Sequence, residues 1–260
     1  YEVEEATCKK CGKPVVIGKT EKMSKSLKNV IDPDYLIEKY GCDTARMFCL
    51  FAAPPEKDLE WSDQGVEGSF RFLGRVWRLA TDYMEDLQGI APLTGTEEID
   101  EDLKKLRRKT HQTIRKVTTD IEDRFRFNTA ISAVMELVNL VYQLPRPQKD
   151  NPAALAVVRE AIETVVVLLA PIVPHISEAL WNELRPGSSL LEESWPAADP
   201  SALVQDEIEL VLQIGGKTRG KLLVPAGAER TEIERLAVAS ETAGKYMEGR
   251  PAKKVVVVPG

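Results

Sequence analysis

Two lysines near the beginning of the chain have the type and spacing needed to bind phosphate groups. Lys22 and Lys25 lie three residues apart in the segment Lys22-Met23-Ser24-Lys25-Ser26. A lysine ammonium group is a compact charge with three donors that can follow phosphate oxygens. On a mobile loop, such charges let a nucleotide enter and then stabilise the transition state in a partly dried site. For an arbitrary segment of this composition, a basic loop in solvent is the commoner outcome.

A pair of cysteines has the spacing of a metal-binding turn. Cys8 and Cys11 are separated by two residues and followed by Gly12, which is the shape of a zinc knuckle. A structural zinc site needs four ligands, usually from two such pairs. Cys42 and Cys49 lie seven residues apart in or beside an apolar helix, and we expect Cys49 in the core. We therefore predict no bound metal, with zinc at Cys8 and Cys11 as the alternative in which upstream sequence supplies the other ligands.

Two stretches are locally basic, although the chain carries a net charge of −6. Residues 103–119 contain seven Lys or Arg residues and no acid, and residues 210–228 contain three, again without an acid. Both could bind a polyanion, because binding depends on where positive charge gathers rather than on its total. The alternative for the first stretch is a helix face in solvent. From these stretches we select six residues as candidates for contact with such a ligand. Lys104, Arg108 and Arg115 lie on one stripe of the predicted helix, and Lys217, Arg219 and Lys221 are expected on one face of a strand.

The composition is that of a soluble globular chain with real hydrophobic cores. The chain has 260 residues, of which 43% are hydrophobic and 29% charged, which suggests about two domains. Pro171 and Pro174 cut off the apolar run Val165–Ala170, which is too short to span a membrane. Four cysteines and no secretory signal favour a reducing, cytoplasmic setting without membrane association. Tyr1 is not an initiating methionine, which favours a fragment or a processed product.

Helices must position most of these residues, since apolar side chains recur at helical spacing from residue 63 to about residue 185. The predicted helix starts are Asp32 with Pro33, Asp43, Ser62, Asp100, Phe127 and Pro152, with a shorter helix over His175–Leu184. Four long amphipathic helices joined by short polar loops predict a mainly α protein built on an antiparallel bundle. The four tryptophans, Trp61, Trp77, Trp181 and Trp195, are expected to be packing residues.

The last part of the chain changes to a period of two, which predicts strands. Apolar and polar residues alternate from Glu207 to Ile214, and Gly215-Gly216 is a two-residue hairpin signal. We expect helical structure from about Thr231 to Glu248 and then a strand in the segment KKVVVV. The predicted domains are residues 1–62, residues 63–198 as the helical bundle, and residues 203–260 as a small α/β module.

Several motifs together resemble a known family. The segment at residues 22–26 is identical to the KMSKS signature of class I aminoacyl-tRNA synthetases. The sequence that follows, SLKNVIDPDYLIEKYGCDTARMFCLFAAPPEKDLEWSDQGVEGSFRFLGRVW, is similar to the bacterial leucyl-tRNA synthetases. The resemblance continues through FNTAISAVMELVN, LLAPIVPHISEALWNEL and QIGGKTRGKLLVPA, and it covers nearly all of residues 19–260.

This resemblance implies an ATP-dependent ligase that joins leucine to its tRNA and uses Mg²⁺. In that family the KMSKS loop binds the phosphates of ATP, so the resemblance assigns this role to residues 22–26, with Lys22 and Lys25 as catalytic residues. The first domain would be the KMSKS end of a catalytic core, the bundle an anticodon-binding-type domain, and the last module a tRNA-binding domain. The resemblance assigns tRNA binding to the hairpin residues Lys217, Arg219 and Lys221. For Lys104, Arg108 and Arg115 it makes tRNA phosphates the polyanion that their charge and spacing would suit. We expect a monomer.

The departures from the family pattern are as informative as the matches. His111 and His175 are the two histidines, and neither lies in the HIGH-type motif that family members carry, so we expect structural roles for both. The amino-acid pocket and the editing domain also have no counterpart. The chain therefore resembles a C-terminal portion that lacks the N-terminal catalytic portion, and we predict that it is inactive alone. The alternatives are another class I synthetase (isoleucyl, valyl or methionyl) and a non-catalytic RNA-binding protein derived from a synthetase.

Overall fold

The computed structural model describes residues 6–16, 21–95, 97–204, 207–247, 250, 252 and 254–257. The helices are α1 (Pro33–Tyr40), α2 (Cys42–Ala52), α3 (Asp63–Leu87), α4 (Glu101–Glu122), α5 (Phe127–Gln143), α6 (Pro152–Leu169), α7 (Pro174–Leu184), α8 (Arg230–Ala239) and α9 (Glu241–Met247). The strands are β1 (Ala6–Thr7), β2 (Pro14–Val15), β3 (Glu207–Ile214) and β4 (Lys217–Pro225), and two 3₁₀ turns lie at Leu190–Glu192 and Ser201–Leu203. The prediction of a mainly α fold is confirmed.

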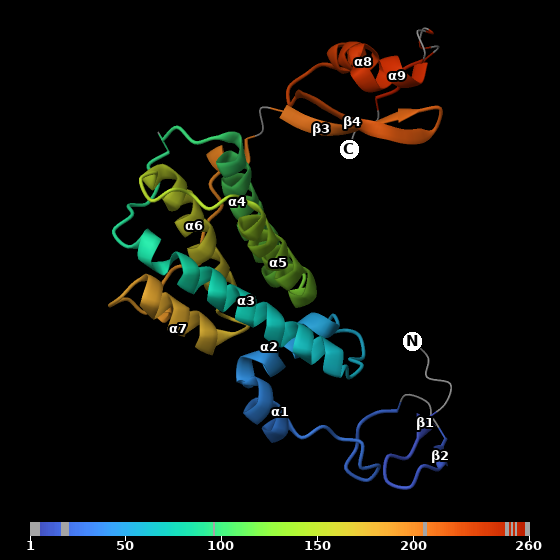
Figure 1. Ribbon diagram of the computed structural model, residues 1–260, viewed down its shortest axis with the longest axis vertical. Coiled ribbons are helices and arrows are strands. Elements are labelled where there is room, and N and C mark those ends of the chain that lie inside the picture. Colours follow the sequence, from blue (N-terminus) through green and yellow to red (C-terminus); the bar gives the residue numbers. More distant parts are fainter. Residues whose placement is uncertain are drawn as a thin grey trace.

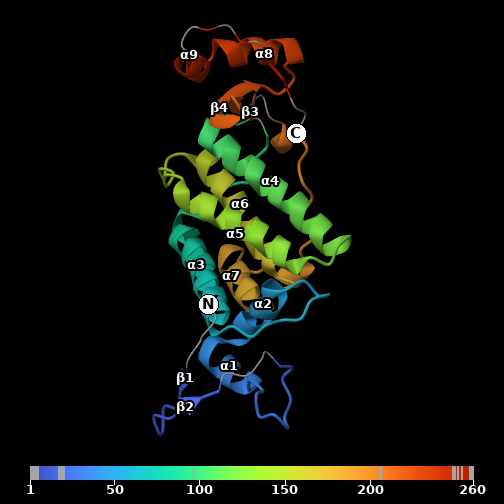
Figure 2. The same ribbon diagram turned by 90° about the vertical axis from the view of Figure 1, so that its right-hand side faces the viewer.

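The elements form three parts that follow one another along the long axis of the molecule (Figures 1 and 2). The β1–β2 hairpin and α1 lie at one end, the helices α2–α7 form the middle, and β3, β4, α8 and α9 lie at the other end. No helix in the described part of the chain combines the length and the apolar character that crossing a bilayer requires.

Three of the predicted helix starts are confirmed by capping hydrogen bonds. Asp32 caps α1, Ser62 caps α3 and Asp100 caps α4, and each side-chain oxygen accepts a backbone N–H in the first turn. Such bonds satisfy donors that have no partner within the helix, so short polar side chains are strongly favoured at these positions. Asn151 caps α6 in the same way, directly before Pro152 in the first helical position.

The prediction that Asp43 caps its own helix is wrong. The helix α2 begins one residue earlier, at Cys42, and has no side-chain cap. Asp43 is buried, and its carboxylate accepts hydrogen bonds from groups at the start of α7 instead. The side chain lies on the face of α2 that packs on the bundle, so it is drawn to donors of that packed neighbour.

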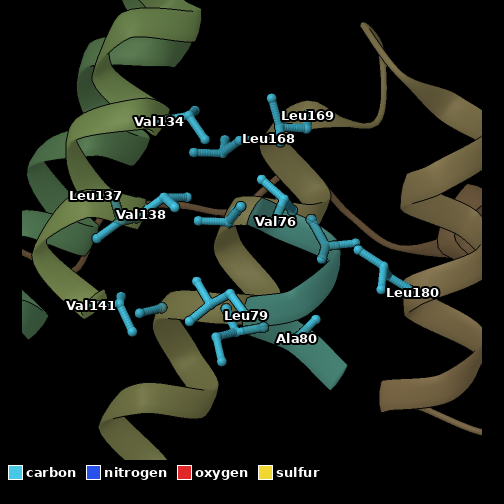
Figure 3. Packing of buried hydrophobic residues seen from close by; sticks show 14 of the residues in the cluster. Val76, Leu79, Ala80, Val134, Leu137, Val138, Val141, Leu168, Leu169 and Leu180 are labelled. Carbon is cyan, nitrogen blue, oxygen red and sulfur yellow. The ribbon is translucent and has the colours of Figure 1, made fainter. Parts of the chain in front are cut away.

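The main core takes side chains from every helix from α2 to α7. Figure 3 shows part of it, with labelled residues of α3, α5, α6 and α7. The predicted inward residues of α5 are all buried, namely Ile131, Val134, Leu137, Val138 and Val141. Leu79 of α3 and Leu168 of α6 meet them from the facing helices (Figure 3). A second, smaller cluster joins Leu36 of α1, Phe48 of α2 and Val66 of α3.

Some core predictions are wrong for residues just beside a buried face. Cys49 is exposed, because the face that α2 buries carries Met47 and Phe48 and the next position turns outward. Trp77 is 41% exposed and Trp195 is 37% exposed, so these two expected packing residues are only partly covered. Trp181 is buried as expected, and the ring of the partly buried Trp61 packs edge-on against Phe48.

The predicted hairpin is present, and Gly215 and Gly216 both have positive φ, as its tight turn requires. The strands β3 and β4 pair antiparallel, but one residue of β4, Arg219, has no partner in β3. This β-bulge changes the alternation along β4. Gly220 pairs with Leu212, on the side covered by α9, whereas Lys221 pairs with Val211 on the other side.

The helical structure predicted after the hairpin is present. It is divided into two helices, α8 and α9, because Ser240 interrupts it. The Ser240 hydroxyl accepts the backbone N–H of Ala243, so the residue caps α9. Residues 254–257 were expected to be part of a strand, but they are not paired in a sheet. Glu248, Lys253 and Val258 of these predictions lie outside the described residues.

Candidate functional site

The loop that contains Lys22 and Lys25 is held by an asparagine at its end. The Asn29 side chain accepts the backbone N–H of Ser24 at 2.8 Å and donates to the carbonyl of Lys22 at 3.4 Å. The Ser24 hydroxyl accepts the backbone N–H of Leu27 at 3.3 Å. These bonds connect both ends of the loop, so its shape is fixed by backbone contacts and the lysine side chains take no part in it.

The lysines of this loop point into solvent. Lys22 and Lys25 are exposed, and within the described residues neither ammonium group has a hydrogen-bond or ion-pair partner. Lys28 is exposed as well, and its φ of 54° places it in the left-handed region where the loop turns toward α1. Three exposed positive charges within seven residues, none of them in an ion pair within the described part of the chain, are suited to a polyanionic ligand such as a triphosphate.

The helices after the loop are fastened to the bundle by two charged residues of α2. Asp43 accepts hydrogen bonds from His175 Nδ1 at 2.8 Å and from the backbone N–H of Ile176 at 2.7 Å, both in the first turn of α7. Arg46, one turn later, donates to the carbonyls of Ile172 at 2.9 Å and Pro171 at 3.1 Å, just after α6 ends. The charges match the backbone, since a helix start offers N–H groups and a helix end offers carbonyls.

Acids pair with most of the cations of the first basic stretch, two from other elements and two from α4 itself. Lys109 of α4 binds Glu136 of α5 at 2.6 Å, and Arg107 binds Asp199 at 2.6 Å. Within α4 itself, Lys104 binds Glu101 at 2.7 Å, and Lys116 pairs with Asp120. The stretch carries no acid in the sequence, but folding brings carboxylates to most of its cations.

The three selected residues of this stretch have different surroundings. Lys104 pairs with an acid, and the half-buried Arg108 donates to the carbonyl of Val204 at 3.3 Å. Arg115 is exposed and has no partner within the described residues. It lines a groove of about 670 Å³ between α4 and α5, together with Lys116 and Arg124. Of the selected residues of α4, Arg115 is therefore the one whose charge is available to a ligand.

Asp120 forms the acidic floor of the same groove. Burial alone would raise the pKa of its carboxyl group, but hydrogen bonds from Lys116 and from the Thr129 hydroxyl outweigh this effect and lower the pKa. The carboxylate therefore stays ionised and holds Lys116 in place at the rim.

The selected residues of the hairpin do not share one face, so that prediction is wrong. Lys217 is exposed next to the turn, and Lys221 lies beyond the bulge on the side of β4 that pairs with Val211. Arg219 is the bulge residue, and its guanidinium lies 4.5 Å from the ring centre of Tyr246 in α9. Strict alternation would have put the three cations together, but the extra residue at the bulge puts Lys221 on the opposite side of the hairpin from Lys217.

Both histidines hold structure together, as expected. His111 is buried, and its Nδ1 accepts the backbone N–H of Asp199 at 3.1 Å. Its Nε2 therefore carries the proton and donates to Glu160 at 3.1 Å. His175 binds Asp43, as described above.

The cysteine pair lies on the turn of the β1–β2 hairpin. The backbone N–H of Cys8 donates to the carbonyl of Lys13 at 2.9 Å, and that of Gly12 donates to the carbonyl of Cys8 at 2.8 Å. Backbone N–H groups of Cys11 and Lys10 lower the pKa of the Cys8 thiol, and the Cys11 thiol adds to this effect. In the part of the chain that the structure describes, no three His, Cys, Asp or Glu side chains form a group that could hold a metal ion.

Sequence reasoning missed Asn29, Asp43 and Arg46 as contributors to the site. Asn29 could have been found, because an amide a few residues after a polar loop commonly bonds to the loop backbone. Asp43 and Arg46 left no such signal, since their partners lie more than 120 residues later in the chain.

Comparisons with known proteins agree with this arrangement. The family model "Anticodon-binding domain of tRNA ligase" matches residues 104–235, which is just over half of the chain. The family model "tRNA synthetases class I (I, L, M and V)" matches residues 14–62, which include the lysine loop, α1 and α2.

The similar proteins found in these comparisons are leucine–tRNA ligases. The ligase of Syntrophus aciditrophicus is 58% identical over 99% of this chain, and that of Laribacter hongkongensis is 54% identical over 98%. The chain spans 30% and 28% of the length of these two relatives. A crystal structure of the Agrobacterium radiobacter K84 agnB2 LeuRS–tRNA–LeuAMS ternary complex is 31% identical and has a TM-score of 0.77, covering 92% of this chain and 30% of that one.

The two family matches follow each other along the chain in the order of the lysine loop and the bundle, and the relatives match over nearly its whole length. The chain therefore belongs to the class I tRNA ligases that carry this anticodon-binding domain, and it corresponds to a portion of a leucine–tRNA ligase.

Proposed function

We propose that this chain contributes the ATP-phosphate loop and the tRNA-binding surfaces to a ligase that attaches leucine to its tRNA. Lys22 and Lys25 would bind the phosphates of ATP, with Met23, Ser24 and Ser26 forming the rest of the loop. The observation that carries this proposal is the pair of exposed ammonium groups on a loop whose shape Asn29 maintains. Such charges are free to move onto a triphosphate without breaking an internal bond.

The chain would supply only part of the reaction. Mg²⁺ would accompany ATP, and since the described residues hold no cluster of carboxylates, the ion would be bound by the phosphates and by residues outside this chain. We infer that the leucine pocket also lies outside it, so the chain alone is inactive. The setting we propose is the cytoplasm, where tRNA is charged.

The tRNA would lie along the bundle and the C-terminal module. The candidates from the sequence are Lys104, Arg108, Arg115, Lys217, Arg219 and Lys221. Arg115 and Lys217 are the strongest of these, because both are exposed and have no partner within the described residues. Contacts of this kind bind phosphates and position the RNA without reading its sequence.

A chimeric ligase tests the role of the loop. This chain replaces the matching segment of the Syntrophus ligase, to which it is 58% identical, and leucine attachment to tRNA is measured. We expect activity in the chimera, and a loss of at least tenfold in kcat for Lys25→Ala with an unchanged helical spectrum. Lys57→Ala is the matched control, an exposed lysine outside the loop. Full activity of the Lys25 variant would contradict the proposal.

Salt-dependent binding tests the RNA surface separately. The affinity of the isolated chain for leucine-specific tRNA is measured over a range of salt concentrations. Arg115→Gln and Lys217→Gln should each weaken binding and reduce the slope of log K against log salt by about one. An unchanged slope for both variants would remove these residues from the interface. Tight tRNA binding together with an inactive chimera would instead favour a non-catalytic RNA-binding protein.

A further inference from the structure

The segment that joins the bundle to the C-terminal module lies along α4 and is hydrogen-bonded to it. Near the end of α4, the Thr118 hydroxyl accepts a hydrogen bond from Trp195 Nε1 at 2.8 Å. Closer to the start of α4, His111 Nδ1 accepts the backbone N–H of Asp199 at 3.1 Å. The segment 195–204 therefore runs back along α4, toward the end of the bundle at which the module lies (Figures 1 and 2).

Asp199 is the centre of this attachment, because its side chain belongs to a network of charged groups. Its carboxylate lies 2.6 Å from the guanidinium of Arg107 in α4. Arg107 also pairs with Glu160 of α6 at 3.4 Å, and Glu160 accepts the Nε2–H of His111 at 3.1 Å. These four residues close a ring, the Asp199 network, and none of their side chains is more than 35% exposed. Water competes weakly for hydrogen bonds at such a site, so the network holds Asp199 in one position.

Polar contacts, rather than buried apolar surface, hold this segment. Of residues 195–204, all of which the structure describes, Ala202 alone is buried. The Asp199 carboxylate also accepts the backbone N–H and the hydroxyl of Ser201, each at 2.8 Å, and so shapes the 3₁₀ turn that follows. Hydrogen bonds are directional, whereas apolar contacts are not. The contacts of Asp199 therefore specify where the segment lies on the bundle.

The C-terminal module begins directly after this segment. Arg108 of α4 donates to the carbonyl of Val204 at 3.3 Å, and β3 begins three residues later, at Glu207. A residue spans at most about 3.5 Å, so the start of β3 lies within roughly 11 Å of Val204. The attachment of the segment to α4 therefore limits where the module can lie relative to the bundle.

We propose that the Asp199 network positions the C-terminal module for tRNA binding, by fixing the point on the bundle from which the module reaches the RNA. This inference rests on the tRNA-binding role proposed for the bundle and the module. Two surfaces that bind one RNA assist each other through their effective concentration, which falls with about the −3/2 power of the length of free chain between them. The attached segment keeps that chain short, so the network raises the affinity without touching the RNA.

The size of the effect follows from the length of chain that the network restrains. With the network intact, about three residues separate the attachment at Val204 from β3. When the network is broken, we expect the single bond at Val204 to open as well, and the free chain then extends back to Trp195, about twelve residues before β3. A free chain about four times as long lowers the effective concentration about eightfold.

The test is the affinity of the chain for leucine-specific tRNA at several salt concentrations. Asp199→Ala should weaken binding about five- to tenfold and leave the slope of log K against log salt unchanged, because no phosphate contact is lost. Glu232→Ala is the matched control, since Glu232 binds Arg235 at the same distance of 2.6 Å within α8 and its loss changes the net charge equally. Removal of an acid by itself favours a polyanion, so the control should bind tRNA at least as tightly as the native chain does.

Amide exchange gives a readout that does not depend on tRNA. Arg107→Met removes the partner of the Asp199 carboxylate from the other side of the bond. It should make exchange faster at the backbone N–H groups of Asp199 and Ser201, while exchange in α5 stays unchanged. The double variant Arg107→Met/Asp199→Ala should bind tRNA about as well as the weaker of the two single variants, because both substitutions act through one bond.

Two results would overturn the proposal. One is an Asp199→Ala variant that binds tRNA as well as the Glu232→Ala control does, and the other is a salt slope reduced by about one or more, which would show that phosphate contacts are lost. Failure of the native chain to bind tRNA would instead contradict the proposed function. Native binding together with an unaffected Asp199→Ala variant would contradict only the role of the network.

Discussion

Replacing Asp43 tests whether α2 is fastened to the bundle by the contacts described above. Its carboxylate accepts two hydrogen bonds from the first turn of α7, from His175 Nδ1 at 2.8 Å and from Ile176 N–H at 2.7 Å. The N-cap position of α7, Val173, has no side-chain cap of its own. Asp43 therefore does for α7 what a capping side chain does elsewhere, although it belongs to another helix.

The cost of the substitution follows from these contacts. Loss of a capping side chain costs about 0.5–2 kcal/mol, and a buried donor left without a partner costs about 1–3 kcal/mol. The two effects overlap at Ile176, so Asp43→Ala should lower the free energy of unfolding by about 2–3 kcal/mol. Asp43→Asn keeps an acceptor but loses the charge at a helix start, which should cost about 1 kcal/mol.

The assay is urea or thermal unfolding followed by circular dichroism at a helical wavelength. Asp43→Ala should lower the Tm of the helical transition by about 5–10 °C. Glu38→Ala is the control, because Glu38 is exposed on α1 and has no partner within the described residues. Its effect should be below about 0.5 kcal/mol. If Asp43→Ala is as mild as this control, the carboxylate does not hold α7 and the reasoning fails.

Three further predictions concern other parts of the chain. The pKa of Glu97 is lowered from 4.5 to about 2, chiefly by hydrogen bonds from the Thr94 backbone N–H and hydroxyl. The stability that the Glu97 carboxylate contributes is therefore complete above pH 4.5 and is lost as the pH falls toward 2. Thr94→Val should raise the pKa of Glu97 in an NMR titration, and an unchanged midpoint would contradict this prediction. Gly220→Val should disrupt the packing of α9 on β4, because even a Cβ would lie 3.0 Å from the Thr242 hydroxyl, and amide exchange in α9 should become faster while exchange in α5 stays unchanged. Leu137→Ala should cost about 2–5 kcal/mol in urea unfolding, since the side chain is fully buried in the main core, and a cost below 1 kcal/mol would show that the core collapses around it.

Much of the fold could be predicted because its signals are local. Asp32, Ser62 and Asp100 cap helices that begin directly after them. A short polar residue in front of apolar residues at helical spacing was therefore enough to predict where each helix starts. The same is true of the hairpin, whose turn needs two residues with positive φ and has two glycines. Each of these features depends on residues within one turn of each other.

The wrong predictions have two causes, which are contacts between residues far apart in the sequence and the single extra residue of a β-bulge. Asp43 looked like a local cap, but it is buried against α7, whose donors compete for it. The bulge at Arg219 has no signature in the alternating pattern, yet it decides that Lys217 and Lys221 do not face the same way. The charge of Lys109 is neutralised by Glu136, which the sequence places 27 residues away. Where charged side chains lie in space, and which of them are paired, could therefore not be predicted from the sequence.

The span of the main core also constrains how the chain folds during its synthesis. Met47 is the first buried residue of the main core along the sequence and Leu190 is the last. The core therefore cannot be fully packed until both residues have left the ribosome. At about 5–20 residues per second, roughly 7–30 s pass between the two. During this time α3, α5 and α6 have been synthesised, but their apolar faces are not yet fully covered. The helix α7 is the last to pack against them. A nascent chain that stalls before residue 190 would therefore expose a broad apolar surface. We expect chaperones to bind the chain mainly during this interval.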